Sequence, residues 1–333
     1  MTKNALYKLE PITDNPKYEG FVFVRKESLR AKGTSLISDF GPQGPAKRRH
    51  LAVPPLAPFW TPQRVVGRVR PYNDYPAVAM LVPAFRRRAV DALRDFLEPN
   101  GELLPLISSV GEYYAYNITT VADILDVERS EFVWTSNEPR VPITIQRYEC
   151  FPEKMAGLSI FRITDKPSSA FVSQTFVDRV RLHRLQGFHF IKLWPLPPGV
   201  SSQEEDQKET EKNLLVETAR GPLPVKGNTV VIRLETAKAK ASRAEKQRLA
   251  KMMDELDSLL YDPRPDAPYF GSVEGDDRVD GELRIFLTCP DADALYEKLR
   301  PWLARLWWKG RAAIMKRYGE FTDPNCREES IDL

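Results

Sequence analysis

The sequence is short of the residues that build disulfide frameworks and metal sites. Its 333 residues include three cysteines and three histidines, and neither Cys-x-x-Cys nor His-x-x-x-His spacing occurs. An odd, sparse set of cysteines argues against a disulfide framework and indicates a reducing compartment. Zinc needs four close ligands of suitable softness, so the missing spacings predict no structural metal, and we expect no cofactor.

Long apolar runs and glycine-rich loops are also missing. No apolar stretch reaches the ~18 residues that a membrane-spanning helix needs, and the first residues lack the apolar run of a signal peptide. The patterns Gly-x-Gly-x-x-Gly, Gly-x-x-x-x-Gly-Lys-Ser/Thr and Gly-x-Ser-x-Gly do not occur. Their absence argues against phosphate binding by a glycine loop and against serine hydrolase chemistry. We therefore expect a cytoplasmic protein without membrane contact.

What is present is the composition of an ordinary globular protein. Hydrophobic residues make up 42% and charged residues 29% of the chain, and the formal net charge is +3. At roughly 150 residues per domain, the length favours two domains. Charge is uneven, because residues 1–100 hold 17 Lys and Arg against 9 Asp and Glu, which leaves −5 for the remaining residues.

Residues 1–200 show strands and short helices without a regular strand–helix rhythm. Apolar residues at helical spacing predict a helix over 84–97, and Ser173 is a candidate cap for a helix over 174–185. A third, short helix is expected over 120–126. The predicted strands cover 103–108, 112–118, 132–134, 141–150, 158–163 and 188–194. This mixture favours an α+β domain with a mixed sheet over a doubly wound sheet.

A polar segment separates this domain from a second one. Residues 201–212 carry five acids and no apolar residue, so we interpret 201–227 as an exposed polar linker. Residues 228–333 follow the order strand, helix, strand, strand, helix, strand, which predicts a smaller ferredoxin-like (βαββαβ) C-terminal domain. A capping box at Ser242 starts its first helix, and Asp291 caps its second. Its strands are expected at 229–234, 269–273, 282–289 and 312–318.

Three groups of residues are candidates for chemistry. Cys150, followed in the chain by His183 or His189, could form a thiolate nucleophile, whereas a lone cysteine usually fills a small buried position. His189 alternates with two phenylalanines along an expected strand, which predicts a partly exposed imidazole. The acidic segment 274–282 does not fit the calcium-loop spacing. It is interpreted as a solvated hairpin turn that could meet a basic partner.

Basic residues concentrate between Lys47 and Arg94. A nucleic-acid-binding module that uses this 47–94 surface is the alternative function. Aromatic residues are not interleaved as RNA-binding surfaces require, so nucleic acid is not the expected partner. Arg86, Arg87 and Arg88 stand at the start of an expected helix, where cations oppose the helix dipole. This placement calls for an acidic partner or an intramolecular acid.

An ordered series of short motifs lies between Asp95 and Trp194. These motifs are Leu97–Leu106, Gly111–Asp126, Ile160–Ile163, Phe171–Ser173, Phe176–Val180 and Leu185–Trp194. In order and spacing they resemble immunity-protein family eleven of bacterial polymorphic toxin systems. The opening Leu6–Pro11 resembles the first strand of that family, so a looser likeness extends over residues 1–200.

The resemblance implies an intracellular protein that is not an enzyme and that binds a secreted toxin to block its active site. The expected partner is a cognate toxin domain, and self-association is left open. An enzyme that uses Cys150 is a third hypothesis. Anchors of protein interfaces are often aromatic or charged. The candidate partner-binding residues are Glu112, Tyr114, Asp123, Asp126, Glu274, Asp276, Asp277 and Asp280.

Overall fold

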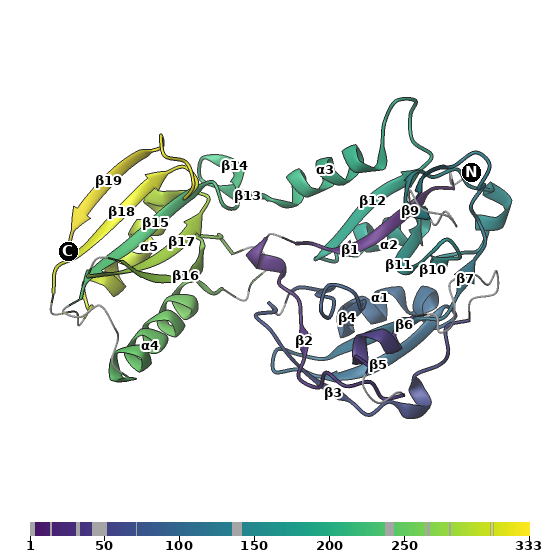
Figure 1. The fold of residues 1–333 in the computed structure, drawn as a ribbon, viewed down its shortest axis with the longest axis horizontal. Helices are drawn as coiled ribbons and strands as arrows, with labels where there is room; N and C mark the ends of the chain where they lie inside the picture. Colours follow the sequence, from purple (N-terminus) through teal and green to yellow (C-terminus); the bar gives the residue numbers. More distant parts are fainter. Residues whose placement is uncertain are drawn as a thin grey trace. The chain divides into compact units, whose positions relative to one another are not determined.

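A computed structural model describes most of the chain. It covers residues 4–13, 15–30, 34–41, 52–70, 72–134, 142–236, 243–262, 264, 267–279, 281–306, 308 and 310–333. Contacts divide the chain into two units, residues 1–213 and residues 214–333. Each unit combines helices and sheets (Figure 1), so the chain is α+β, as the sequence predicts.

Two five-stranded sheets form the frame of the first unit. The first sheet has the order β12-β1-β11-β10-β7 and is antiparallel except for the β10–β7 pair. Its strands are β1 (Leu6–Pro11), β7 (Val121–Ala122), β10 (Ile160–Ile163), β11 (Lys166–Ser173) and β12 (Phe188–Trp194). The second sheet has the order β2-β3-β5-β6-β4 and is antiparallel except for β3–β5. Its strands are β2 (Val22–Phe23), β3 (Gln63–Val66), β4 (Ala84–Arg86), β5 (Gly101–Ile107) and β6 (Tyr113–Ile118).

Helices α1 (Arg87–Leu97) and α2 (Gln174–Leu182) share one core with a face of each sheet. Their buried residues recur every three or four positions, which is the spacing of an amphipathic helix. They are Ala89, Val90, Leu93 and Leu97 of α1, and Phe176, Val177 and Val180 of α2. Tyr7 and Phe190 reach this core from the first sheet, and Phe85 and Tyr116 reach it from the second. Burial of each large side chain contributes roughly 1.5–3 kcal/mol.

The outer face of each sheet has its own apolar cluster. Phe21, Phe23, Leu36 and Phe40 pack on the second sheet. The first sheet is covered by residues around the hairpin of β8 (Glu131–Trp134) and β9 (Pro142–Arg147). Short 3₁₀ turns connect these parts at Pro16–Tyr18, Leu36–Asp39, Ala57–Phe59 and Pro152–Met155.

The segment predicted as an exposed linker contains a helix that belongs to the first unit. Helix α3 (Ser202–Asn213) lies along β12, the edge strand of the first sheet (Figure 1). Its side chains are polar and none of its residues is buried. Ion pairs three residues apart, such as Lys208–Glu205, support its surface. The first part of the predicted linker is therefore helical, and polar contacts rather than apolar burial hold this helix.

His189 of β12 is the main polar anchor of α3. Its Nε2 atom lies 2.9 Å from Asp206 Oδ1, and its Nδ1 atom lies 2.9 Å from Asn213 Nδ2. The amide of Asn213 donates to Nδ1, and Nε2–H donates to Asp206, which matches one neutral tautomer of the imidazole. His189 is buried between these partners. The prediction of a partly exposed imidazole was wrong, because α3 covers this side of the strand.

The second unit is built on one antiparallel sheet with the order β16-β17-β15-β18-β19. Helices α4 and α5 pack on one face of it, through residues such as Leu256 and Leu295. A hairpin of β13 (Leu215–Thr218) and β14 (Gly221–Pro224) precedes the sheet. The elements of the sheet and its helices are β15 (Asn228–Glu235), α4 (Arg243–Leu260), β16 (Ser272–Val279), β17 (Glu282–Cys289), α5 (Ala292–Leu303), β18 (Ala312–Tyr318) and β19 (Arg327–Asp332).

Several predicted elements differ from the structure. Residues 120–126 form no helix, because Val121 and Ala122 pair with β10 as β7. The acidic segment 274–282 is not mainly a turn, since its residues up to Val279 belong to β16 and pair with β17. The strands β11 and β19 were not predicted. Ser242 of the predicted capping box lies outside the described residues, while the cap at Asp291 is confirmed by its bonds to the amides of Asp293 and Ala294.

Candidate functional site

Two predicted partner-binding residues, Glu112 and Tyr114, lie together at the start of β6. The Tyr114 hydroxyl donates to Glu112 Oε1, and Arg87 Nη1 donates to the same oxygen over 3.2 Å. Arg87 also bonds both carboxylate oxygens of Asp91 at 2.9 Å. The Tyr114 hydroxyl and the Arg87 guanidinium lower the pKa of Glu112. The carboxylate is therefore ionised at neutral pH, and its charge is compensated within the chain.

The structure separates the other predicted residues of the first unit from this pair. Asp123 follows β7 at the surface, 3.6 Å from Lys154 Nζ, and Asp126 accepts from the amide of Arg129. Strand β6 alone spans roughly 20 Å at 3.3 Å per residue, and Glu112 and Asp123 lie beyond its opposite ends. Glu112 and Asp123 therefore do not lie side by side in the structure.

Three acidic candidates of the second unit, Glu274, Asp276 and Asp277, lie on β16, an edge strand. Glu274 accepts from the hydroxyl of Thr288 and lies 3.5 Å from Lys226 Nζ. Asp276 is exposed, and Asp277 is half-buried. Asp280 lies outside the described residues. Glu274, Asp276 and Asp277 therefore belong to a paired strand rather than to a solvated turn.

Cys150 does not have the surroundings of an activated thiol. Burial raises the pKa of its thiol to about 12, with a smaller contribution from Glu149, so the thiol stays protonated at neutral pH. His189 is bonded to Asp206 and Asn213, and His183 is exposed at the end of α2. Within the described ranges, no group of three His, Cys, Asp or Glu side chains could hold a metal ion. Across the same ranges, no helix is long and apolar enough to cross a membrane.

The basic run at the start of α1 has intramolecular partners. Arg87 bonds Asp91 and Glu112, and Arg88 Nη1 lies 3.0 Å from the buried carboxylate of Asp74. These acids explain why cations occupy the first turn of a helix. Lys47, also part of the predicted basic surface, lies outside the described residues.

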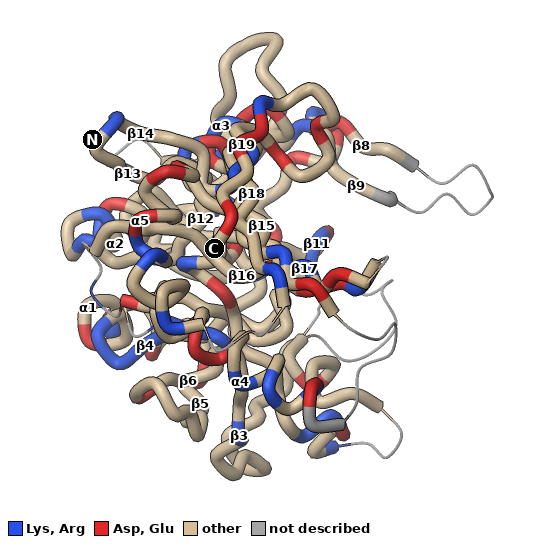
Figure 2. The backbone as a smooth tube through the Cα atoms, turned by 90° about the vertical axis from the view of Figure 1, so that its left-hand side faces the viewer, with Lys and Arg blue, Asp and Glu red and all other residues tan. Residues whose placement is uncertain are grey.

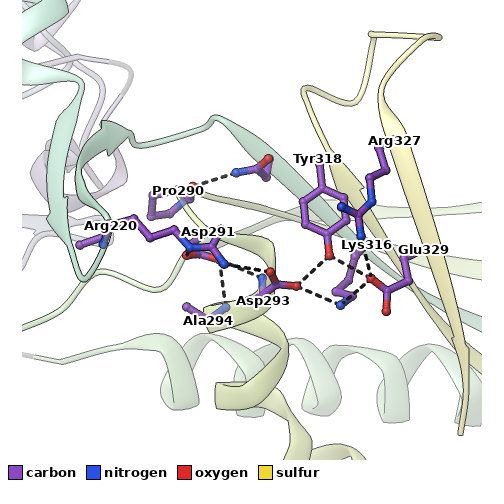
Figure 3. A network of polar contacts seen from close by, with 11 residues as sticks. Arg220, Pro290, Asp291, Asp293, Ala294, Lys316, Tyr318, Arg327 and Glu329 are labelled. Carbon is purple, nitrogen blue, oxygen red and sulfur yellow. Dashed lines mark hydrogen bonds and ion pairs between the residues drawn. The ribbon is translucent and has the colours of Figure 1, made fainter.

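A polar network ties the parts of the second unit together (Figure 3). Lys316 Nζ lies 2.9 Å from Asp293 Oδ1 and 3.0 Å from Glu329 Oε2, and the Tyr318 hydroxyl lies within hydrogen-bond distance of both carboxylates. Arg220 extends from the β13–β14 hairpin to Asp293 over 3.1 Å. Every charge in this network faces an opposite charge, so its role is to join α5, β18, β19 and the hairpin.

Acid is expected to weaken the second unit through this network. Hydrogen bonds from Lys316 and Tyr318 lower the pKa of Asp293 to about 2, against about 3.9 in an unfolded chain. The stabilisation is present above the unfolded value and is lost as the pH falls from about 4 to about 2. Because the carboxylate is partly exposed, we expect a loss of about 1 kcal/mol. This loss of unfolding free energy is measured by urea unfolding at each pH, with the methyl signal of the buried Ile314 as the probe.

The matched variants are Asp293→Asn and Asp276→Asn. The first removes the titrating carboxyl from the network and should flatten the pH profile in this window. The second changes an exposed aspartate on the same sheet and should leave the profile as it is. A profile that stays equally steep in Asp293→Asn contradicts the assignment.

A set of apolar side chains remains exposed on the second sheet of the first unit. Val22 is opposite Val66, and Arg64 is opposite Ile107 in the sheet register. Directly paired residues, and residues two apart on a strand, share a face, so these side chains lie on one face. It is the face that α1 covers over β4 and β6. We call its uncovered part the open face, and it consists of Val22, Val24, Val66, Pro105 and Ile107, all exposed.

A strained turn lies beside the open face. The amide of Ala79 donates to Phe21 O over 2.7 Å, which places residues 78–82 next to β2. Ala77, Ala79 and Met80 have φ angles of 49°, 50° and 61°, a left-handed conformation that costs about 1–2 kcal/mol for each residue other than glycine. This turn presents Met80 and Leu81 with 66% and 67% of their surface exposed. Strain of this kind is concentrated at functional sites.

The border of the open face is basic. Figure 2 shows both signs of charge spread along the chain, so a local excess of one sign is informative. Residues 22–27 and 63–68 together contain four cations and one acid. The exposed cations are Arg25, Lys26, Arg64 and Arg68, and the acid is Glu27. Toward β6 the face ends at Tyr114, which is paired with Pro105.

Sequence reasoning missed the open face, although one signal was present. Four consecutive apolar residues, Phe21 to Val24, put apolar side chains on both faces of a strand. Only the side that carries Phe21 and Phe23 is buried. The sheet order decides which distant segments pair with this strand. A single sequence does not reveal that order, so it does not show which face of the strand stays exposed.

Concave surfaces occur in both units. One, of about 840 Å³, lies by α1 and α2 and is lined by residues that include Phe96 and Leu182. Its polar groups are paired, for example Arg179 with Asp95. The other, of about 980 Å³, lies at the ends of β15 and β18 and is lined mainly by polar residues. Here Arg233 pairs with Glu282.

Part of the first unit matches a known protein family. Residues 106–193 match the model of the immunity protein family Imm11. The matched stretch, called the Imm11 region below, is about a quarter of the chain and runs from β5 to β12. It lies inside the 95–194 stretch that the sequence motifs indicate and includes Ile107, Glu112 and Tyr114. No curated protein matches the chain. The Imm11 region indicates a role in toxin immunity, and immunity proteins are generally non-catalytic.

Proposed function

We propose that this protein is a cytoplasmic immunity protein that neutralises a cognate secreted bacterial toxin by direct, stoichiometric binding. The observation that carries the proposal is the Imm11 match over residues 106–193. The toxin would be the variable domain of a polymorphic toxin that is used in competition between bacteria. The immunity protein would act by occlusion, without a chemical step of its own.

The chemistry of the first unit supports a binding role. The thiol of Cys150 is protonated and buried, and His189 is engaged in holding α3. Exposed apolar side chains with a charged border are typical of a surface that meets another protein. Glu112 and Tyr114 are proposed contacts, because they border the open face. Asp123, Asp126, Glu274, Asp276, Asp277 and Asp280 remain candidate contacts elsewhere.

The second unit is part of the proposal as well. Its strand order and its alternation of strands and helices support a ferredoxin-like βαββαβ domain extended by β19. We propose that the two units are separate domains, and that the first one binds the toxin because it contains the Imm11 region.

Co-expression with the toxin domain encoded beside this gene tests the function. Cells that carry the toxin alone should die, and cells that also carry this protein should grow. The purified pair should co-elute as a 1:1 complex in size-exclusion chromatography. If the neighbouring product is harmless, or never co-elutes with this protein, the proposed function is wrong.

Nucleic-acid binding through the 47–94 surface is the second candidate. The exposed Arg64 and Arg68 favour it, whereas the internal pairing of Arg87 and Arg88 weakens it. This function would give an affinity for RNA or DNA that falls steeply with salt. Fluorescence anisotropy with a 20-nucleotide RNA and a duplex DNA of the same length is the direct measurement.

A further inference from the structure

We infer that the open face, with the turn at Met80 and Leu81, is the docking surface for a folded protein domain whose contact surface is apolar at its centre and acidic at its border. This inference rests on the proposed function and deepens it, because it names the face and the chemistry of the partner. The face lies mostly outside the Imm11 region, on segments near residues 22, 66 and 80.

The first argument is that apolar side chains are exposed here without a structural reason. Val22 and Val66 form a cross-strand pair, and each has about half of its surface exposed, 52% and 54%. Ile107 lies on the same face of β5, and Arg64 of β3 is its neighbour in the register. The opposite face of the same strands is packed with Phe23 and Val65. A group of large apolar side chains that stays exposed on one sheet face is characteristic of an interaction site.

The second argument is the conformation of the adjacent turn. Val78 and Val82 exchange both backbone hydrogen bonds, at 2.8 and 3.1 Å, so the turn is closed at its base. Its left-handed alanine and methionine residues put two large apolar side chains at the tip. A rigid tip loses little conformational entropy when it docks, which favours affinity.

The third argument is charge, and it selects the partner. Four exposed cations and one acid lie along residues 22–27 and 63–68, and Glu112 beside Tyr114 is paired with Arg87, so an acidic border on the partner is complementary. Two copies of this chain would bring like charges together, which argues against self-association through the same face. The apolar centre is aliphatic and offers no platform for stacked bases, so a protein fits better than RNA or DNA.

Affinity measurements with two matched pairs of variants test this inference. The probe is the toxin domain encoded beside the gene, and the full-length protein is used throughout. Val66→Asp puts a carboxylate in the centre of the face and should weaken binding by about 30-fold or more. Leu182→Asp, at an exposed apolar residue on α2, should change binding by less than about threefold. Melting temperatures of both variants verify that they fold.

The second pair tests charge. Arg64→Glu should slow association by about tenfold at low salt, and the difference should shrink at high salt. Arg181→Glu, on the exposed side of α2, should have little effect. Because Arg64 is exposed, this variant is informative even if Val66→Asp fails to fold.

The outcomes separate the two proposals. If the wild-type protein does not bind the toxin domain, the proposed function fails. If it binds with unchanged affinity after both Val66→Asp and Arg64→Glu, the function stands and the docking surface is elsewhere. Loss of binding in Leu182→Asp alone would assign the interface to the concave surface at α1 and α2. Dimers of the wild-type protein that Val66→Asp dissociates, or an RNA affinity that Arg64→Glu abolishes, would also overturn the inference.

Discussion

Replacement of Gly187 by alanine is expected to cost the first unit about 4 kcal/mol of unfolding free energy. Gly187 lies between α2 and β12 with a φ angle of 93°, which L side chains rarely adopt. A Cβ atom there would be 2.0 Å from Asn73 Oδ1 and 3.3 Å from the amide nitrogen of Tyr75. Asn73 cannot yield, because it is fully buried, accepts from the Tyr75 amide and donates to Glu19 O.

Gly157→Ala is the matched control for this prediction. Gly157 has a φ angle of 80°, but no atom lies within 4 Å of the position that its Cβ would occupy. The backbone strain alone should cost about 1 kcal/mol. Urea unfolding followed by the methyl signal of Ile160 reports on the first unit. If both variants lose the same unfolding free energy, the close contact with Asn73 is relieved at no cost and the prediction is wrong.

The second large effect is expected at Arg162, a buried arginine whose side-chain hydrogen bonds to described residues all go to backbone carbonyl groups. Its guanidinium donates to Ile118 O over 3.2 Å, to Pro167 O over 2.6 Å and to Phe40 O over 3.4 Å. It therefore links β10 of the first sheet to β6 of the second and to the segment at Phe40. Burial lowers the pKa of the guanidinium to about 10, so the side chain is still charged at neutral pH.

Arg162→Met should destabilise the first unit by about 3 kcal/mol, because two buried carbonyl groups, of Ile118 and Phe40, and a half-buried one, of Pro167, lose their donor. Arg162→Lys keeps the charge but lacks the planar fork, so it should recover only part of the loss. The control is Arg181→Met at an exposed position of α2, with an expected change within about 0.5 kcal/mol. The stability of all three variants is measured by the urea midpoint of the Ile160 methyl signal. A fully stable Arg162→Met protein would show that the carbonyl groups find other donors.

The sequence predicts correctly those strands and helices that have a strong local sequence pattern. The strands β12, β17 and β18 have the bounds that the sequence indicates, since each is an apolar-rich segment between turn residues. Capping chemistry placed the start of α5 at Asp291. Here local propensity and tertiary structure agree.

Elements that depend on a distant partner were misplaced or missed. Ala84–Arg86 continue the helical spacing of α1, yet they form β4 because they pair with β6. Strand β19 contains one large apolar residue, Ile331, and exists as a strand through pairing with β18. In both cases, long-range hydrogen bonds override the local preference.

The candidate site was less predictable than the fold. Glu112 and Tyr114 became candidates because charge and aromatic rings are visible in a sequence. The open face was not found, because an exposed valine and a buried valine look the same until the sheet order is known. Asp126 and Asp276 are acidic in sequence, but strand pairing and unit boundaries decide which acids share a surface.

The polar attachment of α3 determines where the first unit can be separated from the second. A fragment that ends at residue 200 would lack Asp206 and Asn213, and the buried His189 of the edge strand β12 would lose both partners and its cover. An edge strand that is poorly held in this way can pair with strands of other molecules. Aggregation of such a fragment would result from the truncation and would not indicate a natural assembly. A fragment that ends at Asn213 keeps both partners of His189.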